Sequence, residues 1–202
     1  DYRFAVEICE DLWAAHTPSE DLALAGANII FNTSASDELI GKADYRRLLV
    51  KSTSARLLCG YVYANAPYTE STQDMVCSSH HLIAQNGSIL AENAPFAENE
   101  LVIADIDVQL LSSERHKNTS FHPRAPKRPI ITFAQDVQET KLAHKPLANP
   151  FVPQNEQVLG ERAAAILAVQ SHGLAKRLDH AHAKSAIIGI SGGIDSTLAL
   201  LV

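Results

Sequence analysis

Short apolar runs alternate with amphipathic stretches along the chain from Tyr2 to about Asp107. Runs rich in β-branched and aromatic residues predict strands, whereas apolar residues spaced three and four apart predict helices. A strand–helix–strand order at this spacing is typical of an α/β layer architecture. We expect strands in F-A-V-E-I-C, A-N-I-I-F-N-T-S and C-G-Y-V-Y-A-N-A, and helices from Pro18 to Gly26 and from Ile40 to Leu58.

A β-hairpin and then a proline-rich segment follow. Asn86-Gly87 stands between the strand-like runs M-V-C-S-S-H-H-L-I-A-Q and S-I-L-A-E-N, and Asn-Gly is a strong signal for a two-residue hairpin turn. After about Ser112 the composition changes, and six of the nine prolines fall between His122 and Gln154. Because proline removes a backbone donor and fixes φ, we interpret this segment as a semi-rigid linker, with a short strand at I-I-T-F.

A second domain is predicted after the linker. From Asn155 the helical pattern returns through E-R-A-A-A-I-L-A-V-Q-S-H-G-L-A-K-R-L, and the apolar run A-I-I-G-I predicts a strand that leads into S-G-G-I-D-S. We therefore divide the chain into residues 1–112, a linker at 113–154, and the start of a second domain at 155–202. The only methionine is Met75, and the closing S-T-L-A-L-L-V resembles the first turns of a helix, so we interpret the chain as an internal fragment of a longer protein.

Composition narrows the class of protein. The 202 residues are 46% hydrophobic and 20% charged, with a net charge of −6. This acidity argues against a nucleic-acid partner, which normally requires a basic face. No apolar run approaches the roughly 20 residues that span a bilayer, and three cysteines cannot form a closed disulfide framework. We expect a cytoplasmic protein with no membrane partner.

A glycine loop follows the predicted strand at Ala186–Ile190 and opens a helix. The unpaired N–H groups at a helix N-terminus attract anions, and Gly192 and Gly193 leave room for a phosphate at the backbone. A Walker A loop would need a lysine after the glycines, and a dinucleotide fingerprint would need a different spacing. The motif S-G-G-x-D-S instead resembles the pyrophosphate loop of the N-type ATP pyrophosphatases. The resemblance implies ATP binding by the residues Gly189, Ile190, Ser191, Gly192, Gly193, Ile194, Asp195 and Ser196.

The thiol of Cys9 stands at the end of the first predicted strand, in V-E-I-C-E-D-L-W. A nucleophilic thiol works best on a tight turn beside backbone N–H groups that can receive an oxyanion. The neighbouring Glu7 and Glu10 would disfavour a thiolate, so its activation requires a cation or a general base from elsewhere in the fold.

Five segments carry a second resemblance: V-E-I-C-E-D-L-W, N-T-S-A-S-D-E-L-I-G-K-A-D-Y-R-R-L-L, Y-V-Y-A-N-A, E-S-T-Q-D and N-G-S-I-L-A-E. Together they are similar to the C-terminal part of a nitrilase-superfamily glutaminase domain. Such a domain, joined by a linker to S-G-G-I-D-S, is the arrangement of the glutamine-dependent NAD⁺ synthetase family. The implied fold is α/β: a nitrilase-like α-β-β-α sandwich, followed by the start of a Rossmann-like parallel-sheet domain of the adenine nucleotide alpha hydrolase type.

The resemblance also implies site residues. The family uses a Glu-Lys-Cys triad, in which Cys9 matches the nucleophile, while the glutamate and the lysine precede Asp1. Ser36 and Lys42 match the positions that hold glutamine. Lys42 stands where an arginine is expected, and an ammonium group cannot make the bidentate contact of a guanidinium. Asp195 would help to hold Mg²⁺ near the phosphates, as suits a hard oxygen ligand.

The implied activity makes NAD⁺ from deamido-NAD⁺, ATP and glutamine by way of an adenylated carboxylate, with Mg²⁺ as cofactor. Nitrilase relatives commonly assemble into homo-oligomers, so we expect one here. Two alternatives stay open: another ATP-pyrophosphatase amidotransferase with a different acceptor, and a non-catalytic nitrilase-like scaffold used for assembly.

Other chemistry-bearing residues are interpreted as structural. We expect Cys59 and Cys77 to be core thiols, because neither has the setting of Cys9. The pairs His80-His81 and His180/His182 lack companion ligands at metal-binding spacing, which favours surface or packing roles. Trp13, Tyr61 and Tyr63 are predicted to be core or pocket wall. A run of basic residues is interpreted as a solvated linker face: Arg115, Lys117, Arg124, Lys127 and Arg128.

Overall fold

The computed structural model describes residues 2–98, 101–127, 129–136, 139, 141–142 and 148–202. The chain divides into two compact units, Asp1–Lys145 and Pro146–Val202, and each is described by itself. The division falls inside the predicted linker. The prediction that the linker spans 113–154 remains a prediction.

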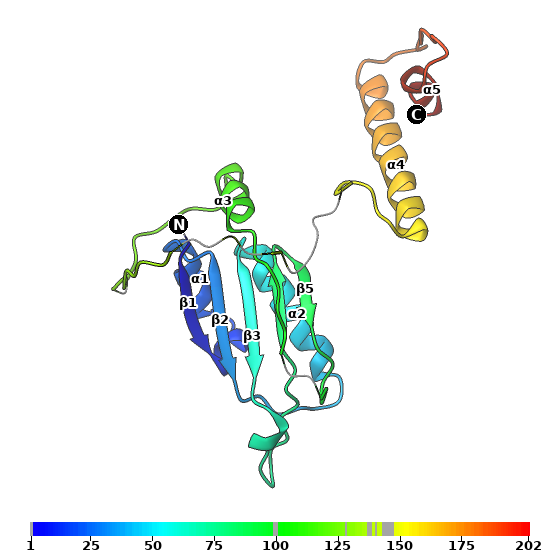
Figure 1. The fold of residues 1–202 in the computed structure, drawn as a ribbon. Coiled ribbons are helices and arrows are strands. Elements are labelled where there is room, and N and C mark those ends of the chain that lie inside the picture. Colours follow the sequence, from blue (N-terminus) through cyan, green and yellow to red (C-terminus); the bar gives the residue numbers. More distant parts are fainter. Residues whose placement is uncertain (1, 99–100, 128, 137–138, 140, 143–147) are drawn as a thin grey trace. The chain divides into compact units, whose positions relative to one another are not determined.

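A five-stranded sheet with the order β1-β2-β3-β4-β5 forms the centre of the first unit (Figure 1). The first three strands are parallel, and the last two are antiparallel. Helices α1 and α2 are the crossovers that join the parallel strands, which confirms the strand–helix–strand prediction. The bounds are β1 Phe4–Ile8, α1 Pro18–Leu24, β2 Ile29–Ser34, α2 Lys42–Arg56, β3 Gly60–Asn65, β4 Leu82–Gln85 and β5 Ser88–Glu92, with the 3-10 turns η1 Cys9–Trp13 and η2 Tyr68–Glu70.

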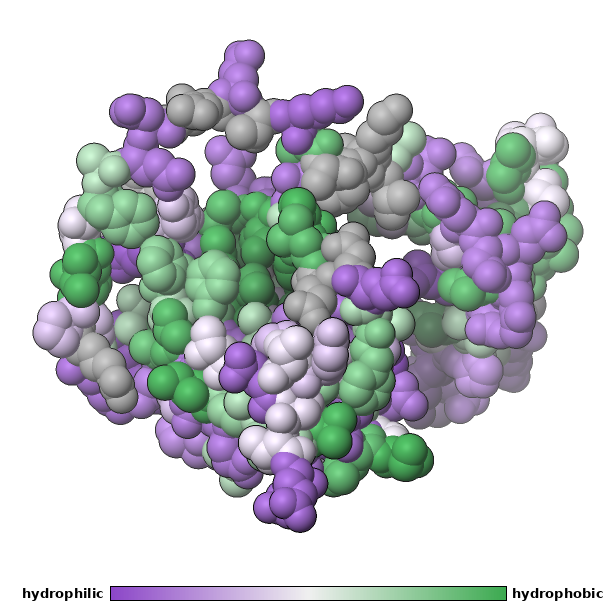
Figure 2. Space-filling view, turned by 60° about the horizontal axis from the view of Figure 1, so that its bottom comes forward, coloured by the Kyte–Doolittle hydropathy of each residue, from purple (hydrophilic) through white to green (hydrophobic). Residues whose placement is uncertain are grey.

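The two faces of the sheet differ in burial. Helices α1 and α2 pack against one face, whose core includes the fully buried Ile30, Tyr61 and Tyr63. Alternate residues of β1 point to the other face, where Phe4 and Val6 are 46% and 51% exposed. In the space-filling view such hydrophobic side chains form green areas between hydrophilic ones (Figure 2). The period of two along a strand therefore separates a packed face from an open one.

The hairpin that Asn86-Gly87 predicts is present between β4 and β5. Both turn residues have a positive φ, 46° and 85°, as a two-residue turn of this type requires. The strand expected over M-V-C-S-S-H-H-L-I-A-Q is shorter than predicted, since β4 begins only at Leu82.

Helix α3, Val108–Lys117, crosses the predicted start of the linker. Its Arg115 donates hydrogen bonds to the carbonyl oxygens of Leu58 at 3.0 Å, Ala27 at 2.8 Å and Leu57 at 3.0 Å. The interpretation of Arg115 as a solvated linker residue is therefore wrong, because it binds carbonyl groups just ahead of β2 and β3. Residues 130–133 form no strand, and Arg128 lies outside the described residues.

A buried polar network joins α2 to the hairpin. The Arg46 guanidinium lies 2.7 Å from His80 Nδ1, and His80 Nε2 lies 2.8 Å from Glu92. Arg46 and His80 are fully buried, so the packing role expected for His80 is confirmed. Glu38 faces Arg46 at 3.0 Å, and Arg47 pairs with Glu92. Burial and the Arg46 cation lower the pKa of His80, and Glu92 and Glu38 oppose them.

We expect the stability of this unit to fall as the pH drops below the ordinary histidine pKa of about 6.5. The folded state resists protonation of His80 whereas the unfolded state accepts the proton, so stability rises with pH in this window. In urea unfolding measured across this pH range, His80→Gln should have a shallower pH slope than the wild type. Replacing the exposed His116 by Gln is the matched control and should leave the slope unchanged. Equal slopes in wild type and His80→Gln would contradict this expectation.

The described residues of the second unit form two helices, α4 Glu156–His180 and α5 Ile194–Leu201. The Asn155 side chain accepts a hydrogen bond from Val158 N at 3.1 Å and so caps α4. The strand predicted at Ala186–Ile190 is not formed, which corrects that expectation. A lone strand has no partner for its backbone groups within the described residues of this unit. Among the described helices of the chain, none is long and apolar enough to span a bilayer.

Candidate functional site

Cys9 lies directly after β1, as the first residue of the turn η1. Its φ is +46°, a left-handed conformation that is uncommon for a residue other than glycine. The backbone N–H of Ile8 donates to Asp11 at 2.8 Å, which closes the turn. Strained backbone of this kind concentrates at functional sites, where the surrounding structure holds it. The predicted position of the thiol, on a tight turn at a strand end, is confirmed.

Burial separates Cys9 from the other two thiols. Cys59 and Cys77 are fully buried, whereas Cys9 is partly exposed. Desolvation raises the pKa of the Cys59 thiol to about 12 and raises the pKa of Cys77 as well. Since the thiolate is the reactive form, the two core thiols are poor nucleophiles. Cys9 is therefore the thiol with access to a substrate.

The three parallel strands end at one edge of the sheet, so β1 and β2 bring Cys9 and Ser36 to the same edge (Figure 1). Ser36 follows β2 and is buried. Its N–H donates to the Asn65 side chain at 2.8 Å, and Asn65 Nδ2 donates back to the Ser36 carbonyl at 3.1 Å. Asn65 is the last residue of β3, so this reciprocal pair fixes the loop after β2.

Lys42, the first residue of α2, lies at the same edge. Its ammonium nitrogen is 5.4 Å from the centre of the Trp13 ring, and Trp13 is the last residue of the turn that Cys9 opens. Lys42 also forms an ion pair with Asp37, and this hydrogen bond holds the pKa of the Asp37 carboxyl below its ordinary value. The structure thus places the three sequence-predicted residues Cys9, Ser36 and Lys42 at the carboxyl ends of the parallel strands.

Sequence reasoning missed two residues of this edge, because Asp37 and Asn65 had no assigned role. Trp13, predicted to be core or pocket wall, lies beside Lys42 and packs against the core. Asn65 carried a usable signal, because it is a polar residue at the carboxyl end of a strand. The Asp37–Lys42 pair joins the β2–α2 loop to the start of a helix, a geometry that depends on the glycine turn at Gly41, whose φ is +82°.

The glycine loop lies in the second unit, at the N-terminus of α5. Gly193 is the N-cap, and Gly192 has a φ of +85°. Ser191 Oγ accepts a hydrogen bond from Gly193 N at 3.3 Å, and Ser196 Oγ donates to the Gly193 carbonyl at 3.1 Å. The loop is exposed, with its two hydroxyl groups 3.3 Å apart. This arrangement offers backbone N–H groups and hydroxyl groups to an anion.

Asp195 lies in the first turn of α5 and, with Arg177 of α4, lines a cavity of about 560 Å³. No group of three or more His, Cys, Asp or Glu side chains is placed to hold a metal among the described residues of the chain. One carboxylate beside hydroxyl groups still fits Mg²⁺, because this ion is usually bound through one or two carboxylates together with substrate phosphates.

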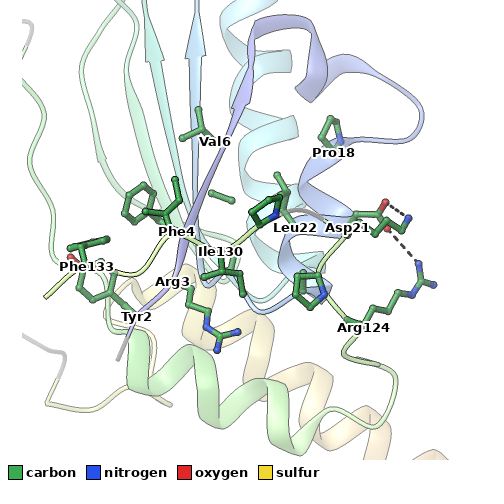
Figure 3. Close-up of a pocket in the computed structure, with 18 residues that line it drawn as sticks. Tyr2, Arg3, Phe4, Val6, Pro18, Asp21, Leu22, Arg124, Ile130 and Phe133 are labelled. Carbon is green, nitrogen blue, oxygen red and sulfur yellow. Dashed lines mark hydrogen bonds and ion pairs between the residues drawn. The ribbon is translucent and has the colours of Figure 1, made fainter.

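A larger cavity, of about 710 Å³, lies beside the start of β1 (Figure 3), and Cys9 is not among the residues that line it. Phe4, Ile130 and Phe133 contribute apolar walls. At its rim Asp21 pairs with Lys127 at 2.8 Å and with Arg124 at 3.6 Å, which ties residues 124–127 to α1. Both basic side chains are mostly exposed, at 64% and 71%, so the interpretation of Arg124 and Lys127 as solvated is confirmed. The residues that line this cavity include none of the three predicted site residues Cys9, Ser36 and Lys42.

Several known proteins are similar to this chain. No family model matches the chain. The glutamine-dependent NAD⁺ synthetase of Mycobacterium tuberculosis (strain H37Rv) is 40% identical over 207 residues, which cover 98% of this chain and 30% of that protein. The Mycobacterium leprae synthetase is 38% identical with the same coverage. The crystal structure of Saccharomyces cerevisiae Nit3, a nitrilase-superfamily member, is 22% identical at a TM-score of 0.46, and the match covers 57% of this chain and 41% of that one.

The chain is an α/β protein in which a turn that begins at Cys9 follows the carboxyl end of the parallel strand β1. Along 98% of its length, the chain is homologous to glutamine-dependent NAD⁺ synthetases. It spans about 30% of the length of these curated relatives.

Proposed function

We propose that this chain carries the glutaminase nucleophile and the ATP-binding loop of a glutamine-dependent NAD⁺ synthetase. The single observation that supports this most is the left-handed Cys9 turn, which stands in a chain that also carries the glycine loop of α5. The similarity to synthetases of that name supports the choice over another ATP-dependent amidotransferase.

In the proposed glutaminase reaction, Cys9 Sγ attacks the carboxamide carbon of glutamine. A carbon–sulfur bond forms and the carbon–nitrogen bond breaks, so ammonia leaves and a γ-glutamyl thioester remains. Water then hydrolyses the thioester to glutamate. Ser36 and Lys42 would hold the amino-acid part of glutamine, with the Lys42 ammonium group facing the α-carboxylate.

In the proposed synthetase reaction, the nicotinate carboxylate of deamido-NAD⁺ attacks ATP, pyrophosphate leaves, and ammonia then displaces AMP. The loop from Gly189 to Ser196 would bind the phosphates through backbone N–H groups, which the N-terminus of α5 favours electrostatically. Asp195 would hold Mg²⁺, which neutralises phosphate charge when it is bound.

The direct test uses the purified full-length protein with ATP, Mg²⁺ and deamido-NAD⁺. The proposal predicts NAD⁺ formation when either glutamine or an ammonium salt is the nitrogen source, with glutamate produced only in the first case. Other carboxylate acceptors should give no amide in parallel reactions. Amidation of another carboxylate, with none of deamido-NAD⁺, would favour the alternative amidotransferase. A protein inactive in every arm would favour the scaffold.

We expect Lys42→Ala to raise the KM for glutamine about 10- to 100-fold, as the loss of a charge-assisted hydrogen bond predicts. Lys42→Arg should keep or lower that KM, because a guanidinium can bind a carboxylate through two parallel hydrogen bonds. Steady-state kinetics of glutamine-dependent NAD⁺ formation measures both variants. Lys51→Ala, on the exposed side of α2, is the matched control. A KM unchanged in Lys42→Ala would remove Lys42 from the glutamine site.

A further inference from the structure

We propose that Asn32 is a positioning residue for Cys9: its side-chain amide holds the backbone carbonyl of the nucleophile and so maintains the left-handed turn. This inference rests on the proposed function, in which Cys9 attacks glutamine. Asn32 lies on β2, one strand away from the thiol, and is fully buried. It opens the segment N-T-S-A-S-D that carries part of the family resemblance, but no role was assigned to it from the sequence.

The contact itself is specific. Asn32 Nδ2 donates to the Cys9 carbonyl oxygen at 3.4 Å. Ser34 Oγ donates to Asn32 Oδ1 at 2.6 Å, so the amide has its oxygen occupied and its nitrogen turned toward the Cys9 turn. A buried amide with both ends engaged has little rotational freedom. The pair Asn32–Ser34 therefore presents a fixed donor to the nucleophile's peptide group.

The Cys9 turn needs such a partner. With φ at +46°, a residue that carries a Cβ is in a sparsely populated backbone conformation that persists only where its surroundings hold it. The orientation of the peptide group after Cys9 determines where the following N–H groups point, and these are the donors available to a developing oxyanion. A constraint on the Cys9 carbonyl thus acts on the geometry of the reaction.

Asn32 is itself fixed by a buried polar chain. Burial raises the pKa of Tyr61, and the Asn32 side chain beside the Tyr61 hydroxyl acts to lower it. The Tyr61 hydroxyl donates to Glu7 Oε1, and Glu7 Oε2 accepts a hydrogen bond from Ser19 N at 2.9 Å. Glu7, two residues before Cys9, is paired with Asn32 in the sheet register. The chain ties β1, β2, β3 and the start of α1 together beneath the nucleophile.

Two variants of the full-length protein test the inference. Asn32→Asp keeps the shape of the side chain but replaces the donor with an acceptor, and Ser34→Ala removes the hydroxyl that fixes the amide. We expect kcat for glutamine-dependent NAD⁺ formation to fall about 100-fold in Asn32→Asp and about 10-fold in Ser34→Ala, the scale on which misplaced reacting groups slow catalysis. The KM for glutamine and the ammonium-dependent rate should stay within about twofold of wild type.

The matched control is Tyr63→Phe. Tyr63 is as buried as Tyr61 on the same strand, but its hydroxyl has no hydrogen-bond partner among the described residues. Its removal should leave kcat unchanged. If Asn32 served only the stability of the sheet, ammonium-dependent synthesis would fall together with glutamine use, and that result would overturn the proposal. Wild-type kcat in both variants would overturn it equally. If Asn32→Asp fails to fold, Ser34→Ala alone decides between these outcomes.

A second readout keeps this inference separate from the proposed function. The rate at which iodoacetamide alkylates Cys9, followed by mass spectrometry, depends on the turn and not on NAD⁺ synthesis. We expect Asn32→Asp to slow it about 10-fold and Tyr63→Phe to leave it unchanged. If the wild type makes no NAD⁺ from glutamine, the proposed function fails, and this rate still tests the positioning role. An alkylation rate unaffected by Asn32→Asp would contradict it.

Discussion

Replacement of Cys9 by alanine is expected to lower glutamine-dependent NAD⁺ synthesis by at least about 10⁴-fold, the scale on which enzymes lose activity with their nucleophile. Ammonium-dependent synthesis should remain, because the thiol lies in the first unit and the ATP loop in the second. The measurement is NAD⁺ formation by the full-length protein, with each nitrogen source in turn. Loss of glutamine-dependent synthesis with retention of ammonium-dependent synthesis would indicate that Cys9 acts only in the release of ammonia from glutamine.

The matched control for Cys9→Ala is Cys59→Ala. Cys59 is fully buried, and desolvation raises the pKa of its thiol to about 12, so its loss should leave the use of glutamine intact. If Cys9→Ala loses ammonium-dependent synthesis to the same degree, the assignment of glutamine hydrolysis and ATP-dependent amidation to two separate sites is wrong. If it keeps glutamine use, Cys9 is not the nucleophile.

Replacement of Asp195 by asparagine should lower glutamine- and ammonium-dependent synthesis alike, by about 10²- to 10³-fold. This is the scale of losing one electrostatic contact to a developing charge. The reason is that both nitrogen sources require the adenylated carboxylate. Alkylation of Cys9 should proceed at the wild-type rate in this variant. Both syntheses and the alkylation are measured on the same preparation of full-length protein.

Asp179→Asn is the control for Asp195→Asn, because Asp179 is an exposed carboxylate of the same unit, near the end of α4. It should behave as wild type in both assays. An Asp195→Asn variant with full synthesis would remove this residue from the ATP site. A further signature is the dependence on Mg²⁺: a higher Mg²⁺ concentration should be needed for half-maximal activity in Asp195→Asn than in Asp179→Asn.

The strands and crossover helices of the first unit could be predicted because each buries one face, and burial produces a period in the sequence. The same rule explains Cys9: a thiol after an apolar strand breaks the packing pattern at the point where the chain turns. The hairpin was predictable for a local reason, since Asn86 and Gly87 tolerate the positive φ that the turn requires.

Contacts between distant segments could not be predicted in this way. Arg115 bonds carbonyl groups more than fifty residues away, and no local pattern distinguishes it from the other basic residues of its segment. Nothing in the sequence showed that Asn32 contacts Cys9; the register of β1 and β2 sets it opposite Glu7, and its side chain reaches the Cys9 carbonyl. The strand expected at Ala186–Ile190 was predicted from its local pattern but is not formed. An apolar run forms a strand only where another strand pairs with it.

The role of Cys9 as the nucleophile is tested most directly by the site at which the full-length protein reacts with an electrophilic analogue of glutamine. We expect one covalent adduct per chain, mapped by peptide mass spectrometry to Cys9, with Cys59 and Cys77 unmodified and with protection by excess glutamine. The adduct should abolish glutamine-dependent synthesis and spare ammonium-dependent synthesis. No adduct, or an adduct on either buried thiol in place of Cys9, would contradict the assignment of Cys9 as the glutaminase nucleophile.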